Sequence, residues 1–164
     1  MNKQTKNIAL SAAFSIVVLI FTAYFPRVPL AFGYVHIGDV FVYLSAAILP
    51  FPYSFLGAAL GATLADVLTG YAVYAPFTFF IKAFMALLLT NKNEKIVCKT
   101  NILGIVLGAI ITTAGYFIAD LLLYGFAASL LTIIPNLMQG VVSSILFILL
   151  AFAFDKTNVK KRLR

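Results

Sequence analysis

Apolar stretches long enough to form membrane-spanning helices follow one another through this chain, separated by short polar or proline-containing segments. Of the 164 residues, 63% are hydrophobic and 10% are charged, whereas about 25% of the residues of a typical globular domain are charged. A water-soluble fold of this length exposes too much of its surface to bury so many apolar side chains. We therefore expect an integral membrane protein that contacts the lipid bilayer.

The breaks between the apolar stretches predict the helix boundaries. A transmembrane helix needs about 20 mostly apolar residues, and fewer where its ends lie in protein-lined cavities. Prolines end helices, and the first apolar run is too long for a secretory signal peptide. The sequence predicts an all-α bundle of six transmembrane helices in a single membrane domain, residues 1–164, with helices at about residues 7–25, 37–49, 53–68, 76–89, 102–123 and 134–154.

Basic residues predict the orientation of this bundle. If the N-terminus is cytoplasmic, six crossings also place three other segments in the cytoplasm. They are the turn between the second and third helices, the loop between the fourth and fifth helices, and the C-terminus. These segments hold ten basic residues, and the opposite side holds only Arg27. The ten are Lys3, Lys6, Lys92, Lys95, Lys99, Lys156, Lys160, Lys161, Arg162 and Arg164. The positive-inside rule therefore predicts cytoplasmic N- and C-termini, and the net charge of +7 indicates contact with anionic lipid and not with nucleic acid.

Ionisable residues lie within or beside the apolar stretches between residues 33 and 82. Asp39 falls in the first turn of the second predicted helix, Asp66 near the end of the third, and Lys82 inside the fourth. Charge at membrane depth is costly, so such residues pair with each other or surround a polar ligand. Asp66 and Lys82 are expected at similar depth, which predicts an ion pair, with direct ligand binding by Asp66 as the alternative.

Tyrosines and amides at the outward-facing helix ends suggest a small pocket for a flat polar heterocycle. Such a site combines aromatic walls with a few hydrogen-bonding groups. Tyr116 and Asp120 on the fifth helix either line this pocket or pair elsewhere. The candidate substrate-binding residues are Tyr34, His36, Asp39, Asp66, Tyr71, Tyr74, Thr78, Lys82, Asn136 and Gln139.

Catalytic and metal-binding alternatives have less support in the sequence. Asp39 and Asp66 raise an intramembrane aspartyl enzyme as the alternative from another class, because two carboxylates sharing a proton are the chemistry that it needs. The Gly-x-Gly-Asp pattern of that class is absent at Asp39. His36 has no second His or Cys near it, which favours a hydrogen-bonding role at a loop-to-helix junction over a metal site. No phosphate-binding loop or nucleophile motif occurs, so we expect no enzyme activity, no metal and no cofactor in this chain.

Small residues gather near the cytoplasmic end of the first helix. They are Ala9, Ala12 and Ala13. Small side chains let helices approach closely. They therefore indicate packing against another helix of this chain or docking of a separate membrane partner.

These features resemble the substrate-binding S components of energy-coupling factor (ECF) vitamin transporters. The resemblance is carried by residues 9–13, 33–39, 57–66 and 70–82, including the Tyr71 to Pro76 segment. It is strongest to the branch that contains riboflavin, hydroxymethylpyrimidine and vitamin B6 carriers. The Pro50-Phe51-Pro52 turn departs from the Gly-Pro turn that is usual there.

The resemblance implies a carrier in the plasma membrane of a prokaryote that captures a vitamin from outside. Ala9 and Ala13 would face a membrane-embedded T component, to which two ATPases bind and supply the energy of ATP hydrolysis. The expected ligand is a small aromatic vitamin or precursor, pyridoxine-type or hydroxymethylpyrimidine. A riboflavin or thiamine-related S component is the alternative.

Overall fold

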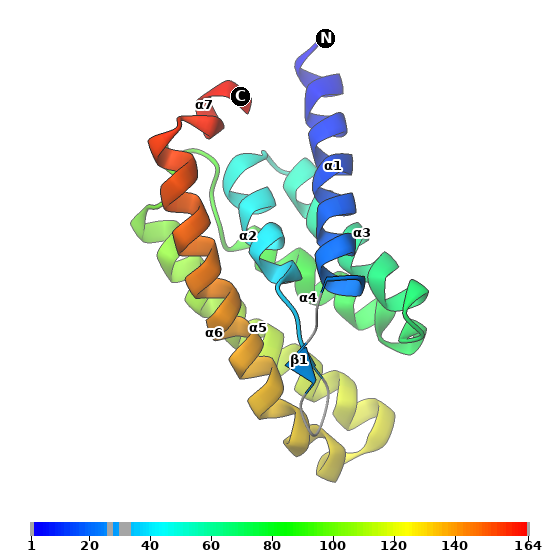
Figure 1. The fold of residues 1–164 in the computed structure, drawn as a ribbon. Coiled ribbons are helices and arrows are strands. Elements are labelled where there is room, and N and C mark those ends of the chain that lie inside the picture. Colours follow the sequence, from blue (N-terminus) through cyan, green and yellow to red (C-terminus); the bar gives the residue numbers. More distant parts are fainter. Residues whose placement is uncertain (1, 26–27, 30–33, 164) are drawn as a thin grey trace.

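The computed structural model describes residues 2–25, 28–29 and 34–163, and this part of the chain is almost entirely helical. The elements are α1 (Lys3–Ala23), β1 (Val28–Pro29), β2 (Tyr34–Val35), α2 (Gly38–Ile48), α3 (Tyr53–Leu68), the 3-10 turn η1 (Ala72–Tyr74), α4 (Ala75–Leu87), α5 (Lys99–Tyr124), α6 (Phe126–Lys156) and α7 (Val159–Leu163). Figure 1 shows them as a bundle in which α5 and α6 run side by side along one flank.

The helices fall into a long class and a short class. In the described chain, α1, α5 and α6 are long and apolar enough to cross a membrane, whereas α2, α3 and the η1–α4 segment are shorter apolar helices. With 11 residues, α2 extends about 16 Å, roughly half the thickness of the hydrocarbon core. Its N-terminal turn is buried at Gly38 and Asp39, so a helix end with polar groups lies inside the protein.

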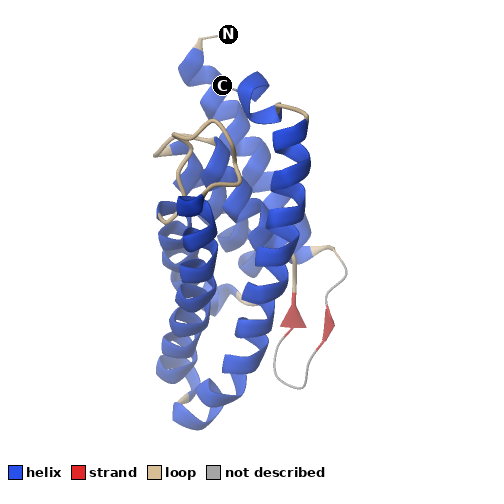
Figure 2. Ribbon diagram, turned by 90° about the vertical axis from the view of Figure 1, so that its left-hand side faces the viewer, coloured by secondary structure: helices blue, strands red, loops and turns tan. Residues whose placement is uncertain are grey.

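The chain direction brings distant segments to the same end of the bundle. The start of α1 lies beside α7 (Figure 1), and Lys6 Nζ donates a hydrogen bond to Arg162 O at 3.3 Å. The β1–β2 hairpin lies toward the opposite end (Figure 2). The C-terminal halves of α1, α3 and α5 meet the N-terminal halves of α2, α4 and α6 in that part of the molecule.

Helix α2 is the centre of the bundle. It contacts α1, α3, α4 and α6, and ten of its eleven residues are buried. A helix that is apolar all round is expected where other helices surround it. The outer faces of α5 and α6 instead expose large apolar side chains such as Ile110 and Ile145, which suits contact with lipid.

The sixth helix begins earlier than the sequence predicts. A loop was expected before residue 134, yet α6 begins at Phe126 and contains Pro135. Only Gly125, with a φ of 87°, separates it from α5. Glycine adopts this left-handed conformation without steric cost, so one residue makes the turn that a longer loop was expected to make.

Other boundaries differ at the ends of the chain. The first helix begins at Lys3 instead of residue 7, because the side chain of Asn2 caps it by accepting a hydrogen bond from Thr5 N at 2.7 Å. The fifth begins at Lys99, and the short α7 was not predicted.

The segment after α1 was expected to be a non-helical loop. It contains an antiparallel pair of two-residue strands, in which Val28 lies opposite Val35 and Pro29 opposite Tyr34. Arg27 and Gly33 lie outside the described residues, as does the side chain of Tyr34.

Candidate ligand-binding site

A buried ion pair, extended by a hydrogen bond, joins three helices inside the bundle. Lys82 Nζ on α4 lies 2.7 Å from Asp39 Oδ1 on α2, and each side chain is 1% exposed. Gln139 Nε2 on α6 donates to Asp39 Oδ2 at 2.8 Å. Because Asp39 stands in the first turn of α2, its carboxylate is also favoured by the partial positive charge of that helix end.

This geometry corrects the predicted partner of Lys82. The sequence predicts an Asp66–Lys82 pair from similar depth on neighbouring helices, whereas the ion pair of Lys82 is with Asp39. The first turn of α2 lies inside the bundle beside α4, so Asp39 reaches the ammonium group. Asp66 instead lies on the wall of a cavity.

A second polar network lies around Asp120 on α5. The Tyr74 hydroxyl donates a hydrogen bond to Asp120 Oδ1, and the Thr132 hydroxyl donates to Oδ2 at 2.6 Å. Close by, the hydroxyls of Thr78 and Tyr116 are hydrogen-bonded at 2.9 Å. These contacts tie η1, α4, α5 and α6 together with hydroxyl groups directed at one region.

A cavity of about 130 Å³ lies between the two networks. Its walls come from every helix from α1 to α6 except α2, together with His36 and η1. The lining residues are Thr22, His36, Ala62, Asp66, Tyr71, Tyr74, Thr78, Lys82, Tyr116, Asp120, Thr132, Pro135, Asn136 and Gln139. Aromatic rings and hydrogen-bonding groups in a concave site are the features expected of a small-molecule pocket.

Comparison with known families decides what kind of protein has this site. The family model described as "ECF-type riboflavin transporter, S component" matches residues 1–156. The chain belongs to the ECF-type riboflavin transporter S component family. This S component is therefore a multi-pass membrane protein of a transport system and not an enzyme, so the intramembrane aspartyl enzyme considered from Asp39 and Asp66 is wrong.

A solved structure shares the fold of this S component. It is described as the S component of a bacterial ECF transporter and matches with a TM-score of 0.74 and 24% sequence identity. The match covers 94% of this chain and 98% of the other. No curated protein sequence matches the chain.

The structure of this S component brings most of the predicted site residues together. His36, Asp66, Tyr71, Tyr74, Thr78, Lys82, Asn136 and Gln139 line the cavity. Asp39 lies behind Lys82 as its ion-pair partner. The side chain of Tyr34 lies outside the described residues.

His36 occupies the junction that was expected for it. Its Nδ1 accepts a hydrogen bond from Gly38 N at 3.1 Å, just before α2 begins, and the side chain is 7% exposed. A neutral imidazole that accepts at Nδ1 carries its hydrogen at Nε2. No group of three or more His, Cys, Asp or Glu side chains suited to a metal ion occurs in the described chain.

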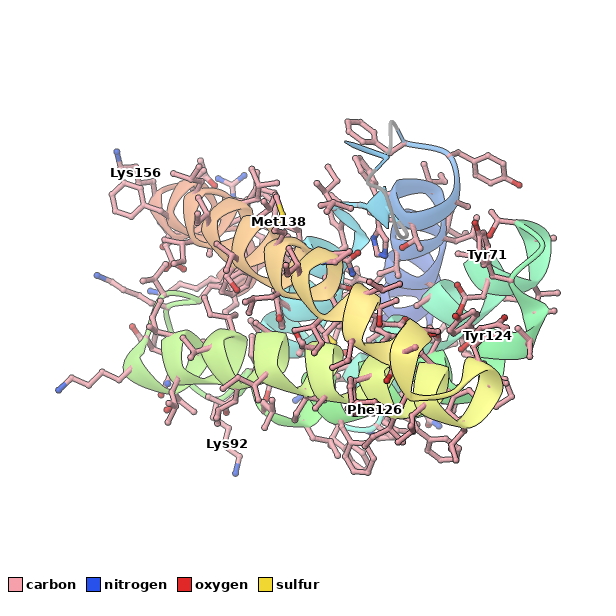
Figure 3. All side chains as sticks on the ribbon, turned by 90° about the horizontal axis from the view of Figure 1, so that it is seen from below. Tyr71, Lys92, Tyr124, Phe126, Met138 and Lys156 are labelled. Atoms are coloured by element: carbon pink, nitrogen blue, oxygen red, sulfur yellow. The ribbon has the colours of Figure 1, made fainter. Side chains whose placement is uncertain are left out.

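Tyr71 and Tyr74 line the cavity near the surface, and the ring of Tyr124 lies beside Tyr74. The rings of Tyr71 and Tyr74 have centroids 6.4 Å apart, and Tyr124 follows at 6.2 Å from Tyr74. Figure 3 shows Tyr71 and Tyr124 at one side of the view, while Lys92 and Lys156 point away from the molecule at the other. Tyr71 is 41% exposed, so this part of the cavity wall lies at the surface.

Two polar lining residues, Thr22 and Thr132, were not found from the sequence, and neither were the apolar Ala62 and Pro135. Thr132 was placed in a loop, although its spacing to Asn136 and Gln139 is that of one helix face. Thr22 was missed because the first helix was considered for helix packing and partner docking and not for ligand binding. The Thr22 side chain is 5% exposed, and its hydroxyl has no hydrogen-bond partner within the described structure.

The alanines of α1 face away from the neighbouring helix. Ser11 Oγ donates to Tyr53 O at 2.8 Å and Ser15 Oγ to Gly57 O at 3.1 Å, so the serine face of α1 packs on α3. Ala9, Ala12 and Ala13 are exposed. Packing inside this chain therefore does not account for them.

Proposed function

We propose that this S component captures a single-ring aromatic vitamin or precursor, pyridoxine-type or hydroxymethylpyrimidine, in the cavity between the Lys82 and Asp120 networks. The observation that carries the proposal is the size of the site. A cavity of about 130 Å³ is smaller than the roughly 300–1,000 Å³ of pockets for drug-sized ligands. One six-membered ring with small polar substituents suits that space.

The side chains around the cavity support the same class of ligand. Tyr74 and Tyr116 lie with ring centroids 6.3 Å apart and offer aromatic faces. Asn136, Thr78 and His36 offer hydrogen-bonding groups along the wall. A flat heterocycle with hydroxyl, hydroxymethyl or amino groups uses both kinds of contact.

The proposed orientation places the cavity at the outer side of the plasma membrane of a prokaryote. The start of α1 and α7 share one end of the molecule, at which basic residues such as Lys6 and Arg162 gather. If six helices cross the bilayer, the positive-inside rule places that end in the cytoplasm. The cavity, in the opposite half, then takes its ligand from outside.

The energy for uptake is proposed to come from partner subunits. A T component docks on the exposed face of α1 formed by Ala9, Ala12 and Ala13, and two ATPases bound to it hydrolyse ATP. Small side chains on that face permit close approach of a second helix. No cofactor is required in this chain.

Riboflavin is the second candidate, and a thiamine-related ligand is a further alternative. The description of the matching family model names riboflavin transport. Tyr71, Tyr74 and Tyr116 also supply rings on which a larger fused heterocycle can stack. Its size would require the rim of the cavity to move outward.

Equilibrium binding to the purified S component tests the proposal. Pyridoxine, hydroxymethylpyrimidine, riboflavin and thiamine are titrated separately in detergent. We expect nanomolar retention of pyridoxine or hydroxymethylpyrimidine, recovered chemically unchanged, and much weaker binding of riboflavin. Tight binding of riboflavin alone would favour the second candidate, and conversion of a bound compound to a product would contradict a carrier function.

A further inference from the structure

Asp39 holds two side chains of the cavity wall through its two carboxylate oxygens. Lys82 Nζ lies 2.7 Å from Oδ1, and Gln139 Nε2 donates a hydrogen bond to Oδ2 at 2.8 Å. Asp39 is 1% exposed, whereas Lys82 and Gln139 both line the cavity. Because both groups bind the same carboxylate, Lys82 and Gln139 present polar atoms to the ligand side by side.

Lys82 offers hydrogen-bond donors to the ligand and no acceptor. An ammonium group has three N–H bonds, of which one is directed at Asp39, and an amine that had given its proton to Asp39 would still have two. Apart from the contact with Asp39, Lys82 Nζ has no hydrogen-bond partner in the described part of the chain. It stands 5.4 Å from the ring centroid of Tyr116, another lining residue. A buried donor without a partner is costly, so an acceptor atom of the ligand stabilises it.

Gln139 offers an acceptor next to that donor. Its Nε2 faces Asp39 Oδ2, because the opposite orientation of the amide would set two oxygen atoms against each other. Oε1 is therefore the other end of the amide, and no group of the described residues donates a hydrogen bond to it. Gln139 is 3% exposed, so a donor of the ligand meets Oε1 with little competition from water.

A ligand edge on which an acceptor stands next to a donor complements these two side chains. A 4-aminopyrimidine has such an edge, because a ring nitrogen with its lone pair adjoins an amino group, and both lie in the ring plane. The ring nitrogen of pyridoxine lies between a methyl-bearing carbon and a C–H, so no donor adjoins it. Its hydroxyl groups rotate, and holding them in place on binding costs conformational entropy.

We propose that Lys82 and Gln139, positioned by Asp39, select an amino-substituted nitrogen heterocycle: a ring nitrogen accepts from Lys82, and the adjoining amino group donates to Gln139 Oε1. The inference rests on the proposed function and narrows it to hydroxymethylpyrimidine over pyridoxine. Asp39 holds the two contacts in place and does not touch the ligand. A site whose buried polar groups stay unpaired with the wrong ligand rejects that ligand strongly.

Matched ligands test this inference on the intact S component in detergent. The 4-methyl analogue of hydroxymethylpyrimidine replaces the amino group by a group of similar size and removes the donor. The aniline analogue replaces both ring nitrogens by C–H and removes the acceptor. Both are expected to bind at least about tenfold more weakly than the parent. The analogue without the 2-methyl group is the control, because it keeps this edge intact and should lose less than about fivefold.

The comparison with pyridoxine separates this inference from the proposed function. Hydroxymethylpyrimidine is expected to bind at least about tenfold more tightly than pyridoxine. Pyridoxine binding as tightly as hydroxymethylpyrimidine, or a 4-methyl analogue as tight as the parent, would overturn the inference and leave the proposed function intact. Retention of riboflavin or thiamine alone would contradict the proposed function as well.

Variants assign each contact to its side chain. Gln139→Met removes Oε1 at similar size, so the affinity ratio of the parent to the 4-methyl analogue should fall below about threefold. The double variant Asp39→Asn, Lys82→Met leaves no lone charge and should lower the ratio of the parent to the aniline analogue in the same way. Asn136→Leu is the matched control, because it removes another amide of the lining and should weaken the parent and the 4-methyl analogue in equal proportion. Wild-type ratios in Gln139→Met and in the double variant would overturn the inference.

Discussion

At the scale of single residues, the buried Asp39–Lys82 pair is costly to disturb. The two groups are 2.7 Å apart and 1% exposed, so each protects the other from being a lone charge in an apolar interior. Removing one partner of a buried pair costs about 3–5 kcal/mol, whereas replacing both by apolar groups is often far milder. The pair therefore favours one arrangement of α2 and α4.

We predict that Asp39→Asn and Lys82→Met each lower the stability of the ligand-free protein by about 3 kcal/mol, and that the double variant loses much less than the sum. Thermal unfolding in detergent, arranged as a double-mutant cycle, measures the coupling. The exposed Lys161–Glu94 pair, at 3.9 Å, is the control and should give no measurable coupling. Strong coupling between Asp66 and Lys82, with none between Asp39 and Lys82, would contradict the structure.

Thr22 supports a second prediction, in which stability and affinity change in opposite directions. Its hydroxyl is buried and has no hydrogen-bond partner in the described part of the chain, so Thr22→Val removes an unsatisfied group and should leave stability equal or higher. If the hydroxyl serves the ligand, affinity falls about threefold to tenfold. Unfolding curves and ligand titrations on the same preparation compare the two. Loss of stability with unchanged affinity would assign Thr22 a structural role.

The sequence predicts which residues line the cavity more reliably than it predicts which of them pair with each other. His36, Thr78 and Asn136 could be placed at the cavity because helix direction and membrane topology bring their segments to the same end. The partner of Lys82 could not, because depth along the bundle does not specify which neighbouring helix faces it. Nothing in the sequence marked Thr22 as a cavity residue, because a threonine near the end of an apolar helix is not distinctive.

At the scale of elements, the close packing of α1 on α3 depends on two glycines of α3. A Cβ added at Gly61 would lie 2.3 Å from the backbone oxygen of Ser15, and one added at Gly57 would lie 3.1 Å from that of Ser11. The four-residue spacing of these glycines is visible in the sequence. The difference in clearance between the two is not, because it depends on the angle at which the helices cross.

The smaller clearance at Gly61 than at Gly57 predicts that an alanine costs more stability at Gly61. Gly61→Ala should destabilise the protein by about 1–3 kcal/mol, since the backbone of α1 must move, and Gly57→Ala should cost less. Leu64→Ala on the same helix is the control, because that side chain is 48% exposed on the lipid-facing surface. Thermal unfolding of the three variants gives the order. A larger loss at Gly57 than at Gly61 would count against the observed packing.

At the scale of the whole molecule, the proposed ligand site and the proposed docking face lie in different halves. The cavity lies in one half of the bundle, and the exposed alanines Ala9, Ala12 and Ala13 lie near the start of α1, in the other half. The all-helical architecture follows from composition and from the breaks between apolar stretches. The early start of α6 does not, because a single glycine provides the turn.

We predict that Ala9→Trp and Ala13→Trp block assembly with the T component and ATPases, because a large side chain keeps the helices apart, while ligand binding stays within twofold of wild type. Co-purification of the partners from membranes measures assembly. Ile145→Trp, at an exposed position on α6, is the control and should assemble normally. Partner yields equal to wild type in both alanine variants would rule out this docking face.

The most direct measurement for the central claim, that the ligand lies between the Lys82 and Asp120 networks, is an equilibrium titration of the retained vitamin into wild-type and variant protein. We predict one site per chain and affinities at least about tenfold lower in Thr78→Val and Asn136→Leu. Thr113→Val is the matched control, because the Thr113 hydroxyl donates to Ala109 O of its own helix at 2.9 Å and should leave affinity unchanged. Wild-type affinity in both cavity variants would contradict this location of the ligand.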